Sequence, residues 1–185
     1  MKVIQKTILA ACASSVFISQ VALSSNAGTE QHWGQWPSVG QAQLSVFIFD
    51  VYQSNLKTPT GDYLQQDDVT PHPLALSIDY QRDISQRQLI DATEEQWQKL
   101  GYGDAERKHW IRQLDQIFPD IEEGQNLTYV TDGQYGQFYH TTASQTAPSM
   151  IGTVNDEALN DAFLSIWLSP KTQFPELRSQ LIGNE

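Results

Sequence analysis

The sequence is poor in cysteine, because Cys12 is the only cysteine in 185 residues. A single thiol cannot form an intramolecular disulfide, and thiolate metal sites need several cysteines. Cys12 also lies in an N-terminal segment that we expect to be removed. The remaining chain is therefore predicted to have no disulfide, no thiolate metal site and no cysteine nucleophile.

Basic residues and the usual catalytic motifs are also scarce. Eleven lysines and arginines face 22 acidic residues, which gives a net charge of −11. Such a chain repels phosphates, so we expect no nucleic-acid partner. The sequence has no G-x-S-x-G elbow, no glycine-rich phosphate loop and no H-E-x-x-H motif. Its histidines are too far apart in sequence for a local metal clamp (His32, His72, His109 and His140). We therefore predict no metal and no cofactor.

The N-terminus has the three-part layout of a secretory signal peptide. Lys2 and Lys6 precede the uncharged residues 7–23, and Ser25-Asn26-Ala27 places small residues at a cleavage site. This predicts a signal peptide over residues 1–27, export to the periplasm, and a mature domain over residues 28–185. No later apolar segment approaches the length of about 20 residues that a membrane span needs, so no stable span is expected in the mature chain.

Lipidation of Cys12 is the alternative to cleavage after Ala27. Leu9-Ala10-Ala11-Cys12 is similar to the site at which bacterial lipoproteins are cut and lipidated. The apolar run before Cys12 is shorter than the core of an ordinary signal, and apolar residues continue beyond it. Cleavage is the favoured interpretation, and lipidation stays open.

The rest of the sequence changes between strand and helix periodicity. Within residues 38–57, both the odd-numbered and the even-numbered positions are largely apolar, which predicts one extended segment covered on both faces. Residues 74–80 alternate as a half-buried strand, residues 126–139 predict a hairpin with an Asp-Gly turn, and residues 150–154 predict a short strand.

Helical spacing follows each group of strands. Ser85 and Gln88 form a capping box that begins a helix ending at Gly101. Three more helices are expected: one capped by Asp104 before Pro119, an amphipathic one capped by Asn155 or Asp156 before Pro170, and one from Thr172 or Pro175 to Gly183. This order predicts an α+β fold, an antiparallel sheet with helices on one face.

The candidate ligand-binding residues are an arginine and three aromatics. Arg82 follows the strand 74–80, and Tyr80 precedes it by two residues, so both are expected on the same side. A guanidinium beside a phenol at the mouth of an apolar cavity would hold a carboxylate. Tyr52 and Trp167, on a strand and a helix, complete the candidate set.

A plainer interpretation of these residues stays open. Arg82 would then be a surface arginine paired with Asp79 or Asp83. Tyr52, Tyr80 and Trp167 would be core residues whose polar atoms are satisfied within the fold.

Five short segments occur in an order that is typical of a known family. They are Val39–Tyr52, Leu76–Ile84 (LSIDYQRDI), Ile117–Gly124 (IFPDIEEG), Ala162–Pro170 (AFLSIWLSP) and Pro175–Arg178. Together they resemble the exported bacterial branch of the chalcone isomerase-like family, over residues 33–183. The resemblance implies an open-faced β-sandwich with a ligand cleft between an antiparallel sheet and a layer of helices. Plant enzymes of this fold cyclise a chalcone to a flavanone, and related plastid proteins bind fatty acids.

The catalytic residues that the resemblance implies are not matched in this sequence. Counting from Trp97–Gly101 and the other segments places the plant catalytic positions near Phe47, Ser85, Ala92 and Asn160. The catalytic arginine that the resemblance implies has no clear counterpart, because no arginine precedes Arg82. Phenylalanine and alanine cannot donate a proton, so the resemblance favours binding over cyclisation.

Three hypotheses on function follow. The first is a periplasmic, non-catalytic protein that binds a small apolar, fatty-acid-like ligand between the sheet and the helices. The second is an intramolecular lyase or isomerase that uses a different residue set, with Tyr52, Tyr80 and Arg82 as candidates. The third is a structural or partner-binding domain without a ligand. The sequence does not identify the ligand or the oligomeric state.

Overall fold

The computed structural model of the chain describes residues 33–46 and 49–184. The predicted signal peptide 1–27, with Cys12, lies outside the described residues, and so does Phe47. Cleavage and lipidation therefore stay predictions.

The strands of the described chain form one six-stranded sheet in the order β1-β2-β3-β4-β5-β6. They are β1 (Ser38–Val46), β2 (Phe49–Lys57), β3 (Leu74–Tyr80), β4 (Asn126–Thr131), β5 (Gly136–Thr141) and β6 (Ser149–Val154). Each strand pairs antiparallel with the next one along the chain. The predicted hairpin over 126–139 and the predicted strands near 74–80 and 150–154 are confirmed.

The prediction of one extended segment over residues 38–57 is wrong. The chain reverses within it, because Val46 pairs with Phe49 and Leu44 pairs with Tyr52 in an antiparallel hairpin. No glycine or proline stands between Val46 and Phe49 to indicate a turn. A register shift between Leu44 and Ser45 also breaks the alternation of the two faces. The apolar residues at both odd and even positions therefore belong to two paired strands rather than to one strand with two covered faces.

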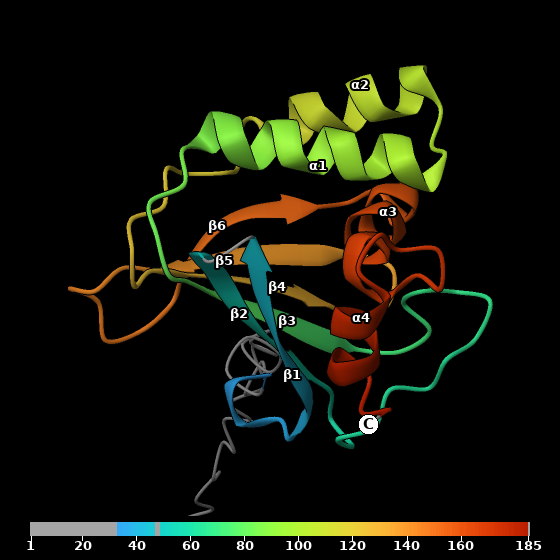
Figure 1. Cartoon of the computed structure of the whole chain (residues 1–185), viewed down its shortest axis with the longest axis horizontal. Helices are drawn as coiled ribbons and strands as arrows, with labels where there is room; N and C mark the ends of the chain where they lie inside the picture. Colours follow the sequence, from blue (N-terminus) through green and yellow to red (C-terminus); the bar gives the residue numbers. More distant parts are fainter. Residues whose placement is uncertain (1–32, 47–48, 185) are drawn as a thin grey trace, which may run out of the picture.

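The helices lie in the long connection between two strands and after the last strand. α1 (Gln86–Leu100) and α2 (Asp104–Leu114) lie between β3 and β4, and α3 (Glu157–Leu168) and α4 (Pro175–Leu181) follow β6. Figure 1 shows α1 and α2 side by side, with α3 between this pair and α4. The chain thus has the predicted α+β architecture, an open antiparallel sheet with its helices on one face.

The two faces of the sheet differ in chemistry, as expected for a sheet covered on one side. Toward the helices, β3 presents Leu74, Leu76, Ile78 and Tyr80, all buried. Toward the other side, polar side chains bond to one another, as in the 2.9 Å contact between the hydroxyls of Ser77 (β3) and Thr128 (β4). The hydrophobic core therefore lies between the sheet and the helix layer.

Local signals in the sequence set both ends of α1. The Ser85 hydroxyl accepts from the backbone N–H of Gln88, while the Gln88 side chain accepts from the backbone N–H of Ser85 at 2.9 Å. The helix ends at Gly101 with φ of 92°, a left-handed conformation that favours glycine. The predicted capping box and C-terminus are both confirmed.

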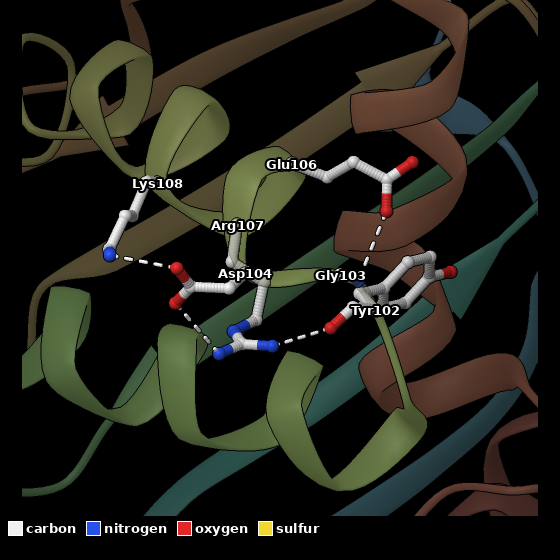
Figure 2. A network of polar contacts seen from close by, with 6 residues as sticks. All are labelled: Tyr102, Gly103, Asp104, Glu106, Arg107 and Lys108. Carbon is white, nitrogen blue, oxygen red and sulfur yellow. Dashed lines mark hydrogen bonds and ion pairs between the residues drawn. The ribbon is translucent and has the colours of Figure 1, made fainter.

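The corner between α1 and α2 is held by polar contacts of its own residues (Figure 2). Arg107 donates to the backbone carbonyl of Tyr102, and the backbone N–H of Gly103 donates to Glu106 at 3.0 Å. Asp104 was expected as the helix cap, but Gly103 occupies that position. Asp104 lies one residue inside the helix, where its carboxylate pairs with Lys108 at 2.8 Å.

Helix α3 is the central element of the helix layer. Asp156 caps it by accepting from the N–H groups of Ala158 (3.0 Å) and Leu159 (3.2 Å), as predicted. Its side chains from Ala162 to Leu168 are all buried. The predicted amphipathic helix is thus covered on nearly every side, because α1, α4 and the sheet surround it.

Candidate functional site

A partly open cavity of about 270 Å³ lies between the sheet and the helix layer. Buried side chains of β2, β3, β4 and α3 form its floor: Tyr52, Tyr80, Leu127, Phe163, Ile166 and Trp167. Its rim is more exposed and comes from β1, α1 and the segment before α4: Leu44, Gln88, Ala92, Gln96 and Phe174. Almost all of this lining is apolar or aromatic, which is typical of a small-molecule site.

Three of the four predicted ligand-binding residues come together in this lining. Tyr52 and Tyr80 are direct partners across β2 and β3, and their rings meet edge to face with centroids 6.0 Å apart. The indole Nε1 of Trp167, on α3, donates a hydrogen bond to the Tyr52 hydroxyl at 2.9 Å. The contact links the sheet to the helix layer at the floor of the cavity.

Arg82 lies apart from these residues. We expected it on the same side as Tyr80, but β3 ends at Tyr80 and the chain bends at residues 81–82. Strand alternation therefore does not extend to Arg82, whose side chain is exposed and is absent from the cavity lining. Asp79 and Asp83 each have another hydrogen-bond partner, since Asn126 donates to Asp79 and the backbone N–H of Glu123 donates to Asp83, both at 2.8 Å.

The two phenols of the cavity are held in the neutral form. Burial raises the pKa of Tyr52 to about 12, although the hydrogen bond from Trp167 acts in the opposite direction. Burial also raises the pKa of Tyr80, and a charge on neighbouring Tyr52 would raise it further. Both groups can donate or accept hydrogen bonds near neutral pH, but neither is a phenolate that could act as a base.

The rim of the cavity combines apolar residues with the amides of Gln88 and Gln96, and its described residues carry no charge. None of the described residues that line the cavity is an acid or a base other than the two tyrosines. Gln88 uses its side-chain oxygen to accept from Ser85 in the helix cap, and Gln96 lies two turns further along α1. An apolar chain could occupy this space, whereas an ionised group buried there would have no charged partner.

Of the described positions that the resemblance links to catalysis, Ala92 lines the cavity and Ser85 and Asn160 do not. Ser85 caps α1 and is not part of the cavity lining. Ala92 lies on the rim and has no polar side-chain atom. Asn160 is fully buried elsewhere, where it accepts from the Tyr129 hydroxyl at 2.9 Å and donates to the Thr70 hydroxyl at 3.0 Å.

Several lining residues were not singled out from the sequence. Phe163 and Ile166 precede Trp167 on α3 by four residues and one residue, and their apolar spacing could have placed Phe163 beside Trp167. Phe174 had no such signal, because it stands in the irregular segment between α3 and α4. Ala92 was indicated by the resemblance alone, through its distance from Trp97–Gly101, and not by the apolar spacing of α1.

The fold and the cavity together define an α+β protein with an open antiparallel sheet and an apolar site under its helix layer. Comparison with known proteins gives the family: residues 40–183 match the chalcone isomerase-like family, and the chain belongs to it. An uncharacterized protein from Haemophilus influenzae is 25% identical over 169 residues, which cover 91% of this chain and 77% of the relative. The resemblance of the five segments to the chalcone isomerase-like family is confirmed.

Within residues 33–46 and 49–184, no helix combines the length and the apolar character that crossing a bilayer requires.

Proposed function

We propose that this protein is exported and binds a small apolar, fatty-acid-like molecule in the cavity between the sheet and the helices, without catalysing a reaction. The composition of the cavity supports the proposal most directly. Its floor is built from buried aromatic and aliphatic side chains, and none of its described lining residues is charged. Moving an apolar chain from water into such a cavity is favourable, whereas a polar or charged ligand would lose its hydration without a partner.

The size of the cavity limits the chain length. A protein cavity of about 150 Å³ accepts benzene, which has six carbons. By the same ratio, the 270 Å³ cavity accommodates roughly ten carbons. Burying about ten methylenes contributes on the order of 8 kcal/mol, and covering the cavity walls adds to it. Association costs about 4–15 kcal/mol, so we expect affinities no tighter than the micromolar range.

The neutral phenols argue against the enzymatic alternative. Acid–base catalysis works best when a group titrates near the operating pH. The only described lining residues with ionisable side chains are Tyr52 and Tyr80, and burial raises the pKa of both. A hydrogen-bonding role for the two hydroxyls fits these pKa shifts better than proton abstraction.

Filling the mouth of the cavity tests the proposal. Ala92 is exposed on α1 and lines the rim, so Ala92→Trp would obstruct the cavity without entering the core. Ala105→Trp is the matched control, because Ala105 is exposed on α2 and does not line the cavity. Both variants exchange alanine for tryptophan on a helix surface, at a similar cost of about 0.5 kcal/mol.

The measurement is displacement of the uncharged fluorescent probe N-phenylnaphthylamine by decanol. We expect Ala92→Trp to lower the affinity for both the probe and decanol about tenfold or more, while Ala105→Trp binds them like the wild type. Circular dichroism would verify that both variants are folded. Equal binding by Ala92→Trp and the wild type would place the ligand elsewhere. Failure of the wild type to bind probe and alcohol would favour the structural or partner-binding alternative.

Export is tested by the mass of the protein isolated from the periplasm. Cleavage after Ala27 would leave a mature chain that begins at Gly28. Lipidation would instead leave Cys12 as the first residue, with acyl groups that increase the mass. Full-length chain in the cytoplasm alone would contradict the proposed export.

A further inference from the structure

A second cavity adjoins the apolar one. It has a volume of about 380 Å³ and shares the lining residues Leu44 and Phe174 with the apolar cavity. These two side chains, from β1 and from the residue before α4, therefore stand between the two spaces. We call the second cavity the polar groove, and the polar residues that line it are Gln43, Ser45, Gln173, Glu176 and Gln180.

The polar groove offers amide and hydroxyl groups but no cation. Gln43 donates to the side-chain oxygen of Gln81 at 2.6 Å and to the backbone carbonyl of Leu44 at 3.2 Å, so its side-chain nitrogen is engaged and its oxygen is the group that could accept from a ligand. Ser45 donates to Asp50 at 2.6 Å, so a second carboxylate lies at this end. Glu176 is the charged residue among the groove-lining residues that the structure describes.

A carboxylate head group would have no favourable partner at this place. It would face Glu176 in the groove, and neither cavity has a lysine or an arginine among its described lining residues. The chain as a whole carries a net charge of −11. A cationic head group is also poorly matched, because an exposed carboxylate contributes little and quaternary ammonium groups need several aromatic rings around them. Phe174 is the one aromatic among the described groove residues.

We propose that the ligand is an amphiphile with an uncharged, hydroxyl-bearing or amide-bearing head group. This inference rests on the proposed function: the tail occupies the apolar cavity, and the head group passes Leu44 and Phe174 into the polar groove. The amides of Gln173 and Gln180 supply donors and acceptors for hydroxyl groups. Glu176 discriminates against free fatty acids.

Four ligands with the same ten-carbon tail test the inference: decanol, monodecanoyl glycerol, decanoate and decyltrimethylammonium. Each displaces N-phenylnaphthylamine from the wild type at low salt and mildly alkaline pH, where decanoate is ionised. We expect the two uncharged ligands to bind about fivefold or more tightly than decanoate, as one like charge at contact distance in water predicts. High salt should reduce the difference, because it screens exposed charges.

Two charge variants locate the discrimination. Glu176→Gln should strengthen decanoate binding severalfold and leave decanol binding unchanged. Glu123→Gln is the control: it alters the net charge equally, but Glu123 is exposed in the loop before β4 and lines neither cavity. The double variant Gln173→Ala/Gln180→Ala should weaken monodecanoyl glycerol more than decanol.

The outcomes separate this inference from the proposed function. If decanoate or the ammonium ligand binds as tightly as the uncharged ligands, the inference on the head group is wrong and the proposed apolar site stands. The same conclusion follows if Glu176→Gln and Glu123→Gln affect decanoate equally. If none of the four ligands displaces the probe, the proposed function itself fails.

Discussion

Asn160 connects the helix layer to the sheet and to a loop, and its replacement gives the strongest test of the core. The residue is fully buried on α3. Its side-chain oxygen accepts from the Tyr129 hydroxyl of β4 at 2.9 Å, and its side-chain nitrogen donates to the Thr70 hydroxyl at 3.0 Å. Tyr129 is only 1% exposed, so water cannot replace the lost acceptor in Asn160→Ala.

The expected loss of stability has two parts. A buried donor without a partner costs about 1–3 kcal/mol. The small void left by the amide adds about 1 kcal/mol. The Thr70 hydroxyl contributes little to the loss, because it keeps contacts with Asp161 and with the backbone carbonyl of Gly133. We expect Asn160→Ala to lose about 2–4 kcal/mol, which for a chain of this size lowers the melting temperature by about 4–16 °C.

Urea denaturation followed by tryptophan fluorescence measures this loss, and a double-mutant cycle assigns it. Tyr129→Phe removes the other partner of the hydrogen bond. The double variant should be more stable than the sum of the two single effects predicts, by about 1–2 kcal/mol. Asn155→Ala, at an exposed position just before α3, serves as the control and should change stability by less than about 0.5 kcal/mol. Additive effects of Asn160→Ala and Tyr129→Phe would refute the reasoning.

Two further predictions concern the same region. At Gly136 on β5, an added Cβ would lie 1.9 Å from the Tyr129 hydroxyl, so Gly136→Ala should cost about 1–3 kcal/mol or more in denaturation, while Gly34→Ala, with open space around it, should be neutral. Burial, together with the carboxylates of Asp68 and Glu157, raises the pKa of Asp161. Protonated Asp161 therefore favours the folded state, and this stabilisation is lost as the pH rises through the folded-state pKa. Asp161→Asn should raise the melting temperature at about pH 7 and have little effect below the ordinary carboxyl pKa of 3.8; a gain that is equal at both pH values would contradict the assignment.

Local signals predicted the parts of the fold that local interactions determine. Ser85 and Gln88 satisfy each other's backbone groups within one turn, and Asp156 caps α3 in the same way. Gly101 ends α1 because the residue after the helix adopts a positive φ, which glycine does at little cost. These contacts join residues a few positions apart, so the sequence alone specifies them.

The errors arose where distant segments decide the conformation. The reversal between Val46 and Phe49 has no turn residue, and it is specified by the pairing of β1 with β2 and of β2 with β3. Arg82 was expected on the cavity side by extending the alternation of β3 two residues beyond its end. The role of Phe174 as a wall shared by two cavities depends on the packing of α4 near β1, which has no periodic signature in the sequence.

The candidate site was predictable to the extent that its residues belong to regular elements. Tyr80 and Trp167 come from a strand and a helix whose periodicity the sequence shows, Tyr52 comes from a segment that was correctly expected to be extended, and the three residues meet in one lining. The same geometry limits what the site can do. The Tyr52 hydroxyl accepts from Trp167, and burial keeps both phenols neutral. Ala92 stands on the rim, near a position where the resemblance to the plant enzymes implies a polar catalytic side chain. A cavity with neutral donors on its floor and uncharged amides on its rim favours retention of an apolar chain over proton transfer, which is why the cavity supports the binding proposal more strongly than the enzymatic alternative.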